Sequence, residues 1–580
     1  MPDPVPPSLP PRRFQVFESL WAVAAMYVAV VVALRWPLAL GLTTDLPADL
    51  GDPAFVSWAI ARASMKWTAL LGGDFSAATN FWDARIFHPQ PLTGAYSEHF
   101  VGHALLTLPA WWLTHNVLLS YNLLFLGSAV LCGIGMYLLV RDLTGLGTAA
   151  FVAGLCFACA PYRVSTSPHL QVQSAQWLPF ALLGLRRFIL SGRWTSLAGA
   201  VGALWLQNLA SGYYMLFFAP LAGLWSVCWL TAERQWANAG RVTALVGAGV
   251  LALLLTLPFA LPYLTVRRYF GATGRPIEEA AAFSADLAAW LTASPLLNLW
   301  GWVRVFPRAE GELFMGVALP LLAVIGVASA MTSRVHKTVT VFALVTGVFA
   351  IWMALGPTPS LMGKPVPIPS LFAVAYNYIP GFSVARVPAR FHMTLLIAGT
   401  LLAGLGAGAI AARPWLLGTF AALAILDGAA VPFPRNTLWA PTSQAQPPPG
   451  RLTPTRPPRV YGYLATLGPE SAIVHFPLGA PEHEIRYMFY SATFPSSMVN
   501  GYSGSPPPDW GDRIASLTWP LRDPDRAWAF MRTLGVTHAV VHDDVWRDDT
   551  GPELRALLAA RGAKLVFHDG PDAIFQLPPQ

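Results

Sequence analysis

The residues that could carry chemistry gather in four short polar segments of an otherwise apolar chain. A carboxylate can take a proton from an attacking hydroxyl or amine, and arginine pairs bidentately with phosphate. Such groups on one side of a membrane would suit a substrate with a lipid tail and an anionic head. The candidates are Asp52, Glu98 and His99 in the first long loop, Arg163 and His169 in APYRVSTSPHLQ, Tyr213 and Tyr214 in QNLASGYY, and Arg386 and Arg390 in PGFSVARVPARF.

Each kind of candidate also has a purely structural interpretation. Asp52 precedes Pro53 and an amphipathic stretch, the pattern of a helix N-cap followed by proline at the first position. Glu98 and His99 could anchor an interfacial helix, and a lone arginine at a span end can simply contact lipid headgroups. Two arginines four residues apart, both beside proline, weaken that last interpretation. His169 is expected to be a hydrogen-bonded structural histidine, and no metal site is predicted.

The composition is that of a polytopic membrane protein. The chain is 54% hydrophobic and only 12% charged, with a mean hydropathy of +0.48, whereas soluble domains carry about 25% charged residues. The net charge of +7 is spread over short loops instead of forming basic clusters interleaved with aromatic residues. Nucleic-acid binding is therefore excluded, and the lysines and arginines are interpreted as orientation signals.

Hydrophobic stretches predict eleven spans, since about 20 apolar residues are needed to cross a bilayer. The segment 101–115 is short and contains Pro109 and two tryptophans, so it is expected to be an interfacial or re-entrant helix. The expected spans are about 17–38, 117–140, 146–161, 173–190, 196–212, 213–231, 241–263, 314–331, 338–355, 391–411 and 414–431.

The charges of the connecting loops predict the orientation of these spans. If 101–115 stays on the outer side, every inner segment contains Lys or Arg, as the positive-inside bias requires. We therefore expect a multi-pass protein of a bacterial inner membrane, with a cytoplasmic N-terminus and a first periplasmic loop at about 39–116. The four polar segments then lie near the same face. The inner segments are Pro11–Arg13, Arg141–Asp142, Arg186–Arg193, Glu233–Arg241, Arg334–Lys337 and Arg413.

The composition changes near Val431, which marks the end of the expected transmembrane domain, 1–431. A Pro-rich linker, 432–450, is followed by a segment with more charge and short alternating apolar runs. We predict strands at Ser471–Phe476, Thr537–His542 and Lys564–Phe567, and helices at Tyr461–Leu467, Pro524–Leu534 and Pro552–Ala560. The fold class is thus an all-α membrane domain, with amphipathic helices in its first outer loop, plus a small periplasmic α/β domain at 451–580.

Several strings in this order resemble the GT-C superfamily of integral-membrane glycosyltransferases, in particular the bacterial branch related to protein mannosyltransferases and aminoarabinose transferases. The strings are NFWDARIFHPQ and YSEHF after Asp52, then APYR…SPHLQVQSAQWLPF and PGFSVARVPARF, and in the tail GYLATLGPESAIVHFPLG. The resemblance implies a polyprenyl-phosphate-linked sugar donor and an acidic residue of the first outer loop acting as base or orienting the acceptor. Asp52 is the best match to that residue. The WWDxG motif of oligosaccharyltransferases and the adjacent acidic pair of protein mannosyltransferases are missing from the sequence, so the acceptor stays open.

The resulting hypothesis is a sugar transfer from a polyprenyl-phosphate donor to a lipid, glycan or protein acceptor at the periplasmic face, by inverting displacement and without a cofactor. Asp52 would be the base, with Glu98 and His99 orienting hydroxyls. Arg386, Arg390 and Arg163 would hold the phosphate, with His169 also in the binding site and Tyr213 and Tyr214 beside the sugar. The alternative is a non-catalytic lipid-linked-saccharide transporter or membrane assembly factor, which would not need Asp52.

Overall fold

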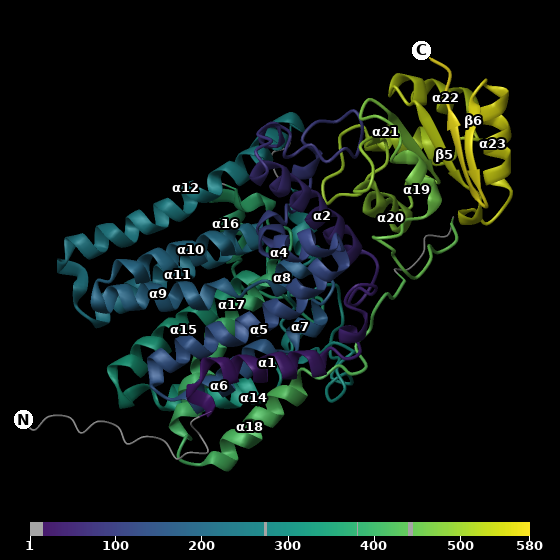
Figure 1. Cartoon of the computed structure of the whole chain (residues 1–580). Coiled ribbons are helices and arrows are strands. Elements are labelled where there is room, and N and C mark those ends of the chain that lie inside the picture. Colours follow the sequence, from purple (N-terminus) through teal and green to yellow (C-terminus); the bar gives the residue numbers. More distant parts are fainter. Residues whose placement is uncertain (1–15, 272–274, 380, 439–444, 580) are drawn as a thin grey trace, which may run out of the picture.

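The computed structural model describes residues 16–271, 275–379, 381–438 and 445–579. The expected inner segment Pro11–Arg13 and part of the expected linker, 439–444, lie outside the described residues. Each of the eleven predicted spans corresponds to one helix of a bundle (Figure 1). These helices are α1 Leu20–Leu34, α5 Val117–Thr144, α6 Gly147–Ala158, α9 Trp177–Ser191, α10 Trp194–Ala210, α11 Gly212–Ala232, α12 Ala239–Tyr269, α14 Ala318–Ala328, α15 Arg334–Ala354, α17 His392–Ala409 and α18 Pro414–Asp427.

Six helical segments of the described chain are long and apolar enough to cross a membrane. They are 117–144, 147–165, 212–232, 239–269, 334–354 and 388–409, and shorter apolar helices cover 20–34, 318–332 and 414–427. Helices form here because a lipid-embedded backbone must satisfy its own hydrogen bonds. Small residues bring helices close: Gly326 of α14 and Gly406 of α17 each leave no room for a Cβ against the backbone of the other helix.

Helices of the connecting segments, most of them short, gather at one end of the bundle. These are α2 Asp52–Leu71, α3 Ser76–Thr79, α4 Val101–Thr114, α7 Tyr162–Ser165 and α8 Leu170–Gln173. Figure 1 shows α2, α4, α7 and α8 at the end nearest the C-terminal domain, whereas the α11–α12 turn lies at the other end. The segment 101–115, expected to be an interfacial or re-entrant helix, forms the 14-residue α4, which contains Pro109. Further short elements lie between α12 and α17. They are α13 Ile277–Ala282, the β1–β2 pair (Ser360–Leu361 with Lys364–Pro365) and α16 Leu371–Tyr378.

The C-terminal part is an α/β domain with a five-stranded mixed sheet in the order β4-β3-β5-β7-β6. β3 is parallel to β4 and β5, and β7 is antiparallel to β5 and β6. The strands are β3 Ala472–Phe476, β4 Ser497–Met498, β5 His538–His542, β6 Lys564–Asp569 and β7 Asp572–Gln576, and the helices are α19 Arg459–Leu464, α20 Pro481–Ser491, α21 Trp510–Leu517, α22 Pro524–Thr533 and α23 Thr550–Ala560. All three predicted strands and all three predicted helices are present. Sequence reasoning missed α20, whose buried face includes Glu482, His483 and Glu484, and it also missed α21, β4 and β7.

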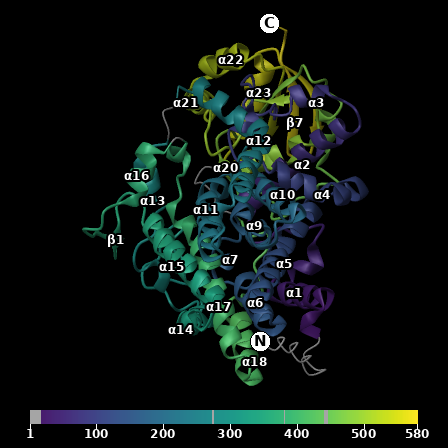
Figure 2. The ribbon, with the colours of Figure 1, turned by 90° about the vertical axis from the view of Figure 1, so that its left-hand side faces the viewer.

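This domain is joined to the first long loop by backbone pairing. The amide of Met498 donates to the Arg85 carbonyl (2.9 Å), and the amide of Phe87 donates to the Asn500 carbonyl (3.0 Å). The fully buried guanidinium of Arg513 bonds the carbonyl oxygens of Phe87 and His88. Figure 2 shows the domain over the same end of the bundle as α2 and α3. The first loop is therefore held between the membrane helices and the C-terminal domain.

Candidate active site

Asp52 stands at the start of α2 with its carboxylate free of the helix end. The N-cap of α2 is Gly51, and α2 has no side-chain cap hydrogen bond, so the alternative interpretation of Asp52 as the N-cap does not hold. The preceding carboxylate, Asp49, accepts the Gly51 amide at 2.8 Å and fixes this turn. Asp52 Oδ2 instead lies 3.3 Å from His169 Nε2, with about a third of its side chain exposed (33%). An acid in the first turn is also favoured by the helix dipole.

His169 lies between two carboxylates that are far apart in the sequence, Asp52 and Glu310. It is the residue before α8, in the tight turn that follows α7, and its Nδ1 is buried with no hydrogen-bond partner among the described residues. Its Nε2 lies 3.3 Å from Asp52 and 3.9 Å from Oε1 of Glu310. The predicted purely structural histidine is thus placed between two acidic groups.

Glu310 carries the next contact, to Arg390. The Arg390 guanidinium donates to Glu310 Oε1 at 2.6 Å, and both side chains are largely buried, at 3% and 11% exposed. Burial is the largest single influence on Glu310 and raises its pKa, but the charge and hydrogen bond of Arg390, together with His169 and Arg386, outweigh burial and hold the pKa of Glu310 below its usual range. Asp52, His169, Glu310 and Arg390, here called the acid–base row, therefore lie in sequence, each polar side chain within 4 Å of the next.

Arginine and tyrosine close the other side of the acid–base row. Arg390 lies over the ring of Tyr213, 5.0 Å from its centroid, and its Nε has no hydrogen-bond partner among the described residues. Arg386 pairs with Glu279 at 3.4 Å. The guanidinium groups of Arg390 and Arg386 thus lie on the Tyr213 side of the acid–base row, and they keep N–H donors that could bind an anion.

Glu98 faces the same group of charges. Burial raises the pKa of Glu98 to about 7, while Arg390 and Arg386 lower it and Asp52 raises it further. Its Oε2 is fully enclosed and has no hydrogen-bond partner in the described part of the chain. Glu98 also lines a cavity with Trp58, Trp82 and Tyr502. It is therefore an acid that changes charge near neutral pH beside both arginines.

Three predicted site residues are turned into the scaffold. Arg163 is fully buried and donates to the carbonyls of Phe157 (2.9 Å) and Gln173 (3.0 Å), so it braces the corner between α6 and α8. Tyr214 is buried and its hydroxyl donates to the Val172 carbonyl. His99 lines the cavity of Glu98, but its Nδ1 accepts the Val101 amide at 3.2 Å at the start of α4, and burial lowers its pKa to about 4. These contacts hold the backbone segments that surround the site.

Sequence reasoning missed three residues at the site: Glu310, Glu279 and Tyr502. Glu310 and Glu279 lie in the long stretch between α12 and α14, where the rarity of acids was the only available signal. Nothing in the sequence marks Tyr502, which comes from the C-terminal domain. Among the described residues no group of three or more His, Cys, Asp or Glu side chains is arranged to hold a metal ion.

The fold and these contacts define a polytopic helical membrane protein whose polar site lies beneath an α/β domain. No protein-family profile and no curated protein sequence matches the chain. Among solved structures it is similar to the apo oligosaccharyltransferase of Archaeoglobus fulgidus, at 13% identity and TM-score 0.43 over 90% of this chain and 70% of that one. It is also similar to ArnT of Cupriavidus metallidurans, at 16% identity and TM-score 0.39 in the apo state and 14% and 0.37 with undecaprenyl phosphate bound, each over 96% of this chain and 99% of that one.

Proposed function

We propose that this protein is a membrane glycosyltransferase that moves a sugar from a polyprenyl-phosphate-linked donor to an acceptor at the periplasmic face of an inner membrane. The observation that carries the proposal is the acid–base row beneath the C-terminal domain, in which the Asp52 carboxylate, which does not cap its helix, is linked through His169 and Glu310 to the guanidinium of Arg390, with the charge of Arg386 also acting on Glu310. A base and a phosphate clamp at one site are what transfer from a lipid phosphate requires. A transporter would use the arginines but has no need of Asp52.

In the proposed reaction an acceptor hydroxyl or amine attacks the anomeric carbon as its proton passes to Asp52. The new bond to the acceptor forms while the bond between the anomeric carbon and the phosphate oxygen breaks, which inverts the anomeric centre. His169 Nε2, 3.3 Å from Asp52, orients the base. Glu98 and Tyr213 contact hydroxyls and one face of the sugar ring.

The departing phosphate is received by Arg390 and Arg386. Arg390 is already held by Glu310 through one terminal nitrogen, so its remaining donors are oriented before the substrate arrives. Preorganised charge of this kind stabilises negative charge as it develops on the leaving group. Arg163, whose guanidinium bonds the backbone of its own corner, is assigned to the scaffold and not to the phosphate.

The test is incubation of purified protein with a panel of radiolabelled polyprenyl-phosphate sugars, measuring loss of label from the lipid. Asp52→Asn removes the base and should lower turnover on the order of 10²-fold or more, with expression and thermal unfolding unchanged. Asp74→Asn is the matched control, because Asp74 lies in the same loop and its carboxylate accepts hydrogen bonds from the amide and hydroxyl of Ser76, outside the acid–base row. Full activity in Asp52→Asn would contradict the proposed base. Binding of the donors without loss of label would contradict the transferase and favour the lipid-linked-saccharide transporter.

A further inference from the structure

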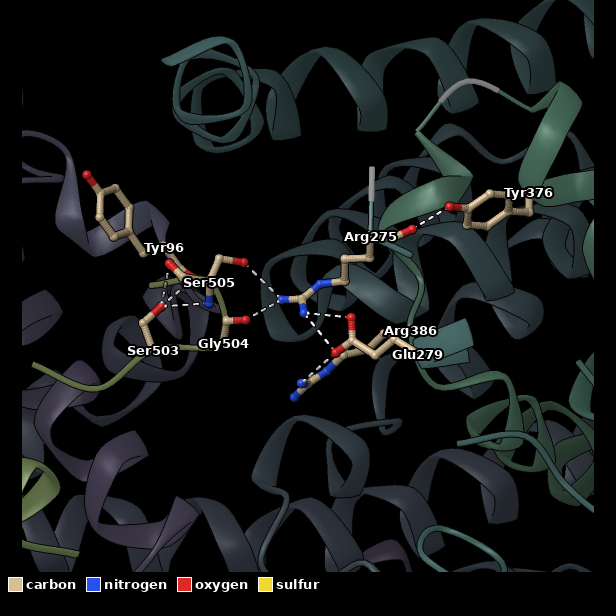
Figure 3. A network of polar contacts seen from close by, with 8 residues as sticks. All are labelled: Tyr96, Arg275, Glu279, Tyr376, Arg386, Ser503, Gly504 and Ser505. Atoms are coloured by element: carbon tan, nitrogen blue, oxygen red, sulfur yellow. Dashed lines mark hydrogen bonds and ion pairs between the residues drawn. The ribbon is translucent and has the colours of Figure 1, made fainter. Parts of the chain in front are cut away.

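A short segment of the C-terminal domain, Tyr502–Ser505, reaches the candidate site. Tyr502 lines the cavity that Glu98 also lines, and its ring stands edge-on to Phe55 of α2, with centroids 5.8 Å apart. The hydroxyl of Ser503 donates to the carbonyl of Tyr96 at 2.7 Å, which ties the segment to the first loop. Figure 3 shows this segment facing a second group of side chains from the 275–386 region.

Arg275 joins that segment to the phosphate-binding side of the site. One terminal nitrogen donates to the Gly504 carbonyl (2.7 Å) and the Ser505 hydroxyl (2.9 Å). The other donates to both carboxylate oxygens of Glu279, at 3.0 and 3.2 Å. The backbone of Arg275 is held in turn, because the Tyr376 hydroxyl donates to its carbonyl. One terminal nitrogen of the Arg275 guanidinium therefore bonds the C-terminal domain, and the other bonds Glu279 of the membrane domain.

Glu279 passes the connection on to Arg386. Its Oε1 accepts from Arg275 and lies 3.4 Å from a terminal nitrogen of Arg386 (Figure 3). An arginine side chain loses rotamer entropy when it is fixed in one position. Because Glu279 is itself oriented by Arg275, part of that ordering is done before a ligand binds.

We propose that Arg275 is a positioning residue through which the C-terminal domain sets the place of Arg386, so that this domain is a working part of the site. The inference rests on the proposed function in one respect, namely that Arg386 contacts the donor phosphate. The contacts run in one order: Gly504 and Ser505 hold Arg275, Arg275 holds Glu279, and Glu279 holds Arg386. Arg275 itself does not touch the substrate.

The first measurement needs no substrate. Amide hydrogen exchange is compared in wild type, Arg275→Ala and Glu279→Gln, and faster exchange is expected in both variants over 383–390 and in Arg275→Ala over 502–506. Arg459→Ala is the control, since its ion pair with Asp569 is on the surface of the same domain and its side chain is 82% exposed. Unchanged exchange over 383–390 in Arg275→Ala overturns the positioning role, whatever the protein binds.

The second measurement is a double-mutant cycle on binding of polyprenyl phosphate to the full-length protein in detergent. Arg275→Ala should weaken binding about fivefold, the upper range for loss of one partly exposed ion pair. If Arg275 acts through Arg386, the double variant Arg275→Ala/Arg386→Ala should bind no more weakly than Arg386→Ala. If the double variant instead loses affinity by the product of the two single-variant losses, Arg275 acts independently of Arg386 and the proposal is overturned. Wild-type binding by Arg386→Ala, together with faster exchange in Arg275→Ala, would refute the phosphate role and leave the linkage standing.

Discussion

The titration of Glu98 offers a direct test of the site. Burial raises its pKa to about 7, with Arg390 and Arg386 acting in the opposite direction. One pH unit below that value about a tenth of the carboxyls are ionised, and one unit above about nine tenths are. If the ionised form accepts hydrogen bonds from a substrate hydroxyl, kcat/KM should rise about tenfold between pH 6 and pH 8.

The variant Glu98→Gln should remove this acidic limb, leaving a lower and flatter profile. Arg386→Gln should move the limb to higher pH, because the charge of Arg386 lowers the pKa of Glu98. The assay is label transfer from the donor at saturating acceptor over pH 5 to 9. A limb near pH 7 that survives in Glu98→Gln would assign the titration to another group and refute the role of Glu98.

The same shift predicts how stability depends on pH. An acid whose pKa is raised on folding, from 4.5 to about 7, binds its proton more tightly in the folded state. Its unfavourable contribution is therefore absent below pH 4.5, grows as the pH rises and is complete above pH 7, reaching at most about 3 kcal/mol. Glu98→Gln should accordingly raise the thermal midpoint at pH 8 and leave it unchanged near pH 4. Equal midpoints at pH 8 would contradict the burial argument.

Three further predictions concern the arginines and the topology. Arg386→Lys and Arg390→Lys should lose more turnover than donor affinity, because lysine keeps the charge but not the bidentate geometry. Arginines that only contact lipid headgroups would tolerate the change, since lysine and arginine each contribute about 1 kcal/mol of attraction to the membrane surface. Wild-type kinetics in both variants would therefore refute the binding of phosphate by these arginines. Arg163→Ala should lower the thermal midpoint and leave donor affinity per folded molecule unchanged, whereas a selective loss of affinity would return it to the phosphate site. A reporter active only in the periplasm should work when fused after Gln580 and stay silent at Gly192, and the reverse pattern would invert the orientation.

The sequence alone determined the architecture because its signals are local. A long apolar run in lipid has to form a helix to satisfy its backbone, and the eleven expected spans coincide with helices. Alternation of apolar residues likewise predicted β3, β5 and β6. Loop order then placed the segments of Asp52, His169 and Arg390 at one end of the bundle, where the structure brings their side chains together.

Side-chain direction and long-range pairing were decided only by the tertiary structure. The sequence around Asp52 fits a cap, but Gly51 occupies the N-cap position, and the Asp52 carboxylate lies beside His169 instead. Arg163 was expected to hold the donor phosphate, yet its guanidinium is buried and donates to the Phe157 carbonyl near the end of α6. Glu310 could be assigned to the site only from its ion pair with Arg390 in the structure, since no local sequence pattern indicates which distant arginine will pair with a buried acid. The same holds for the contact of Arg275 with Gly504, which exists only because the C-terminal domain docks on the first loop.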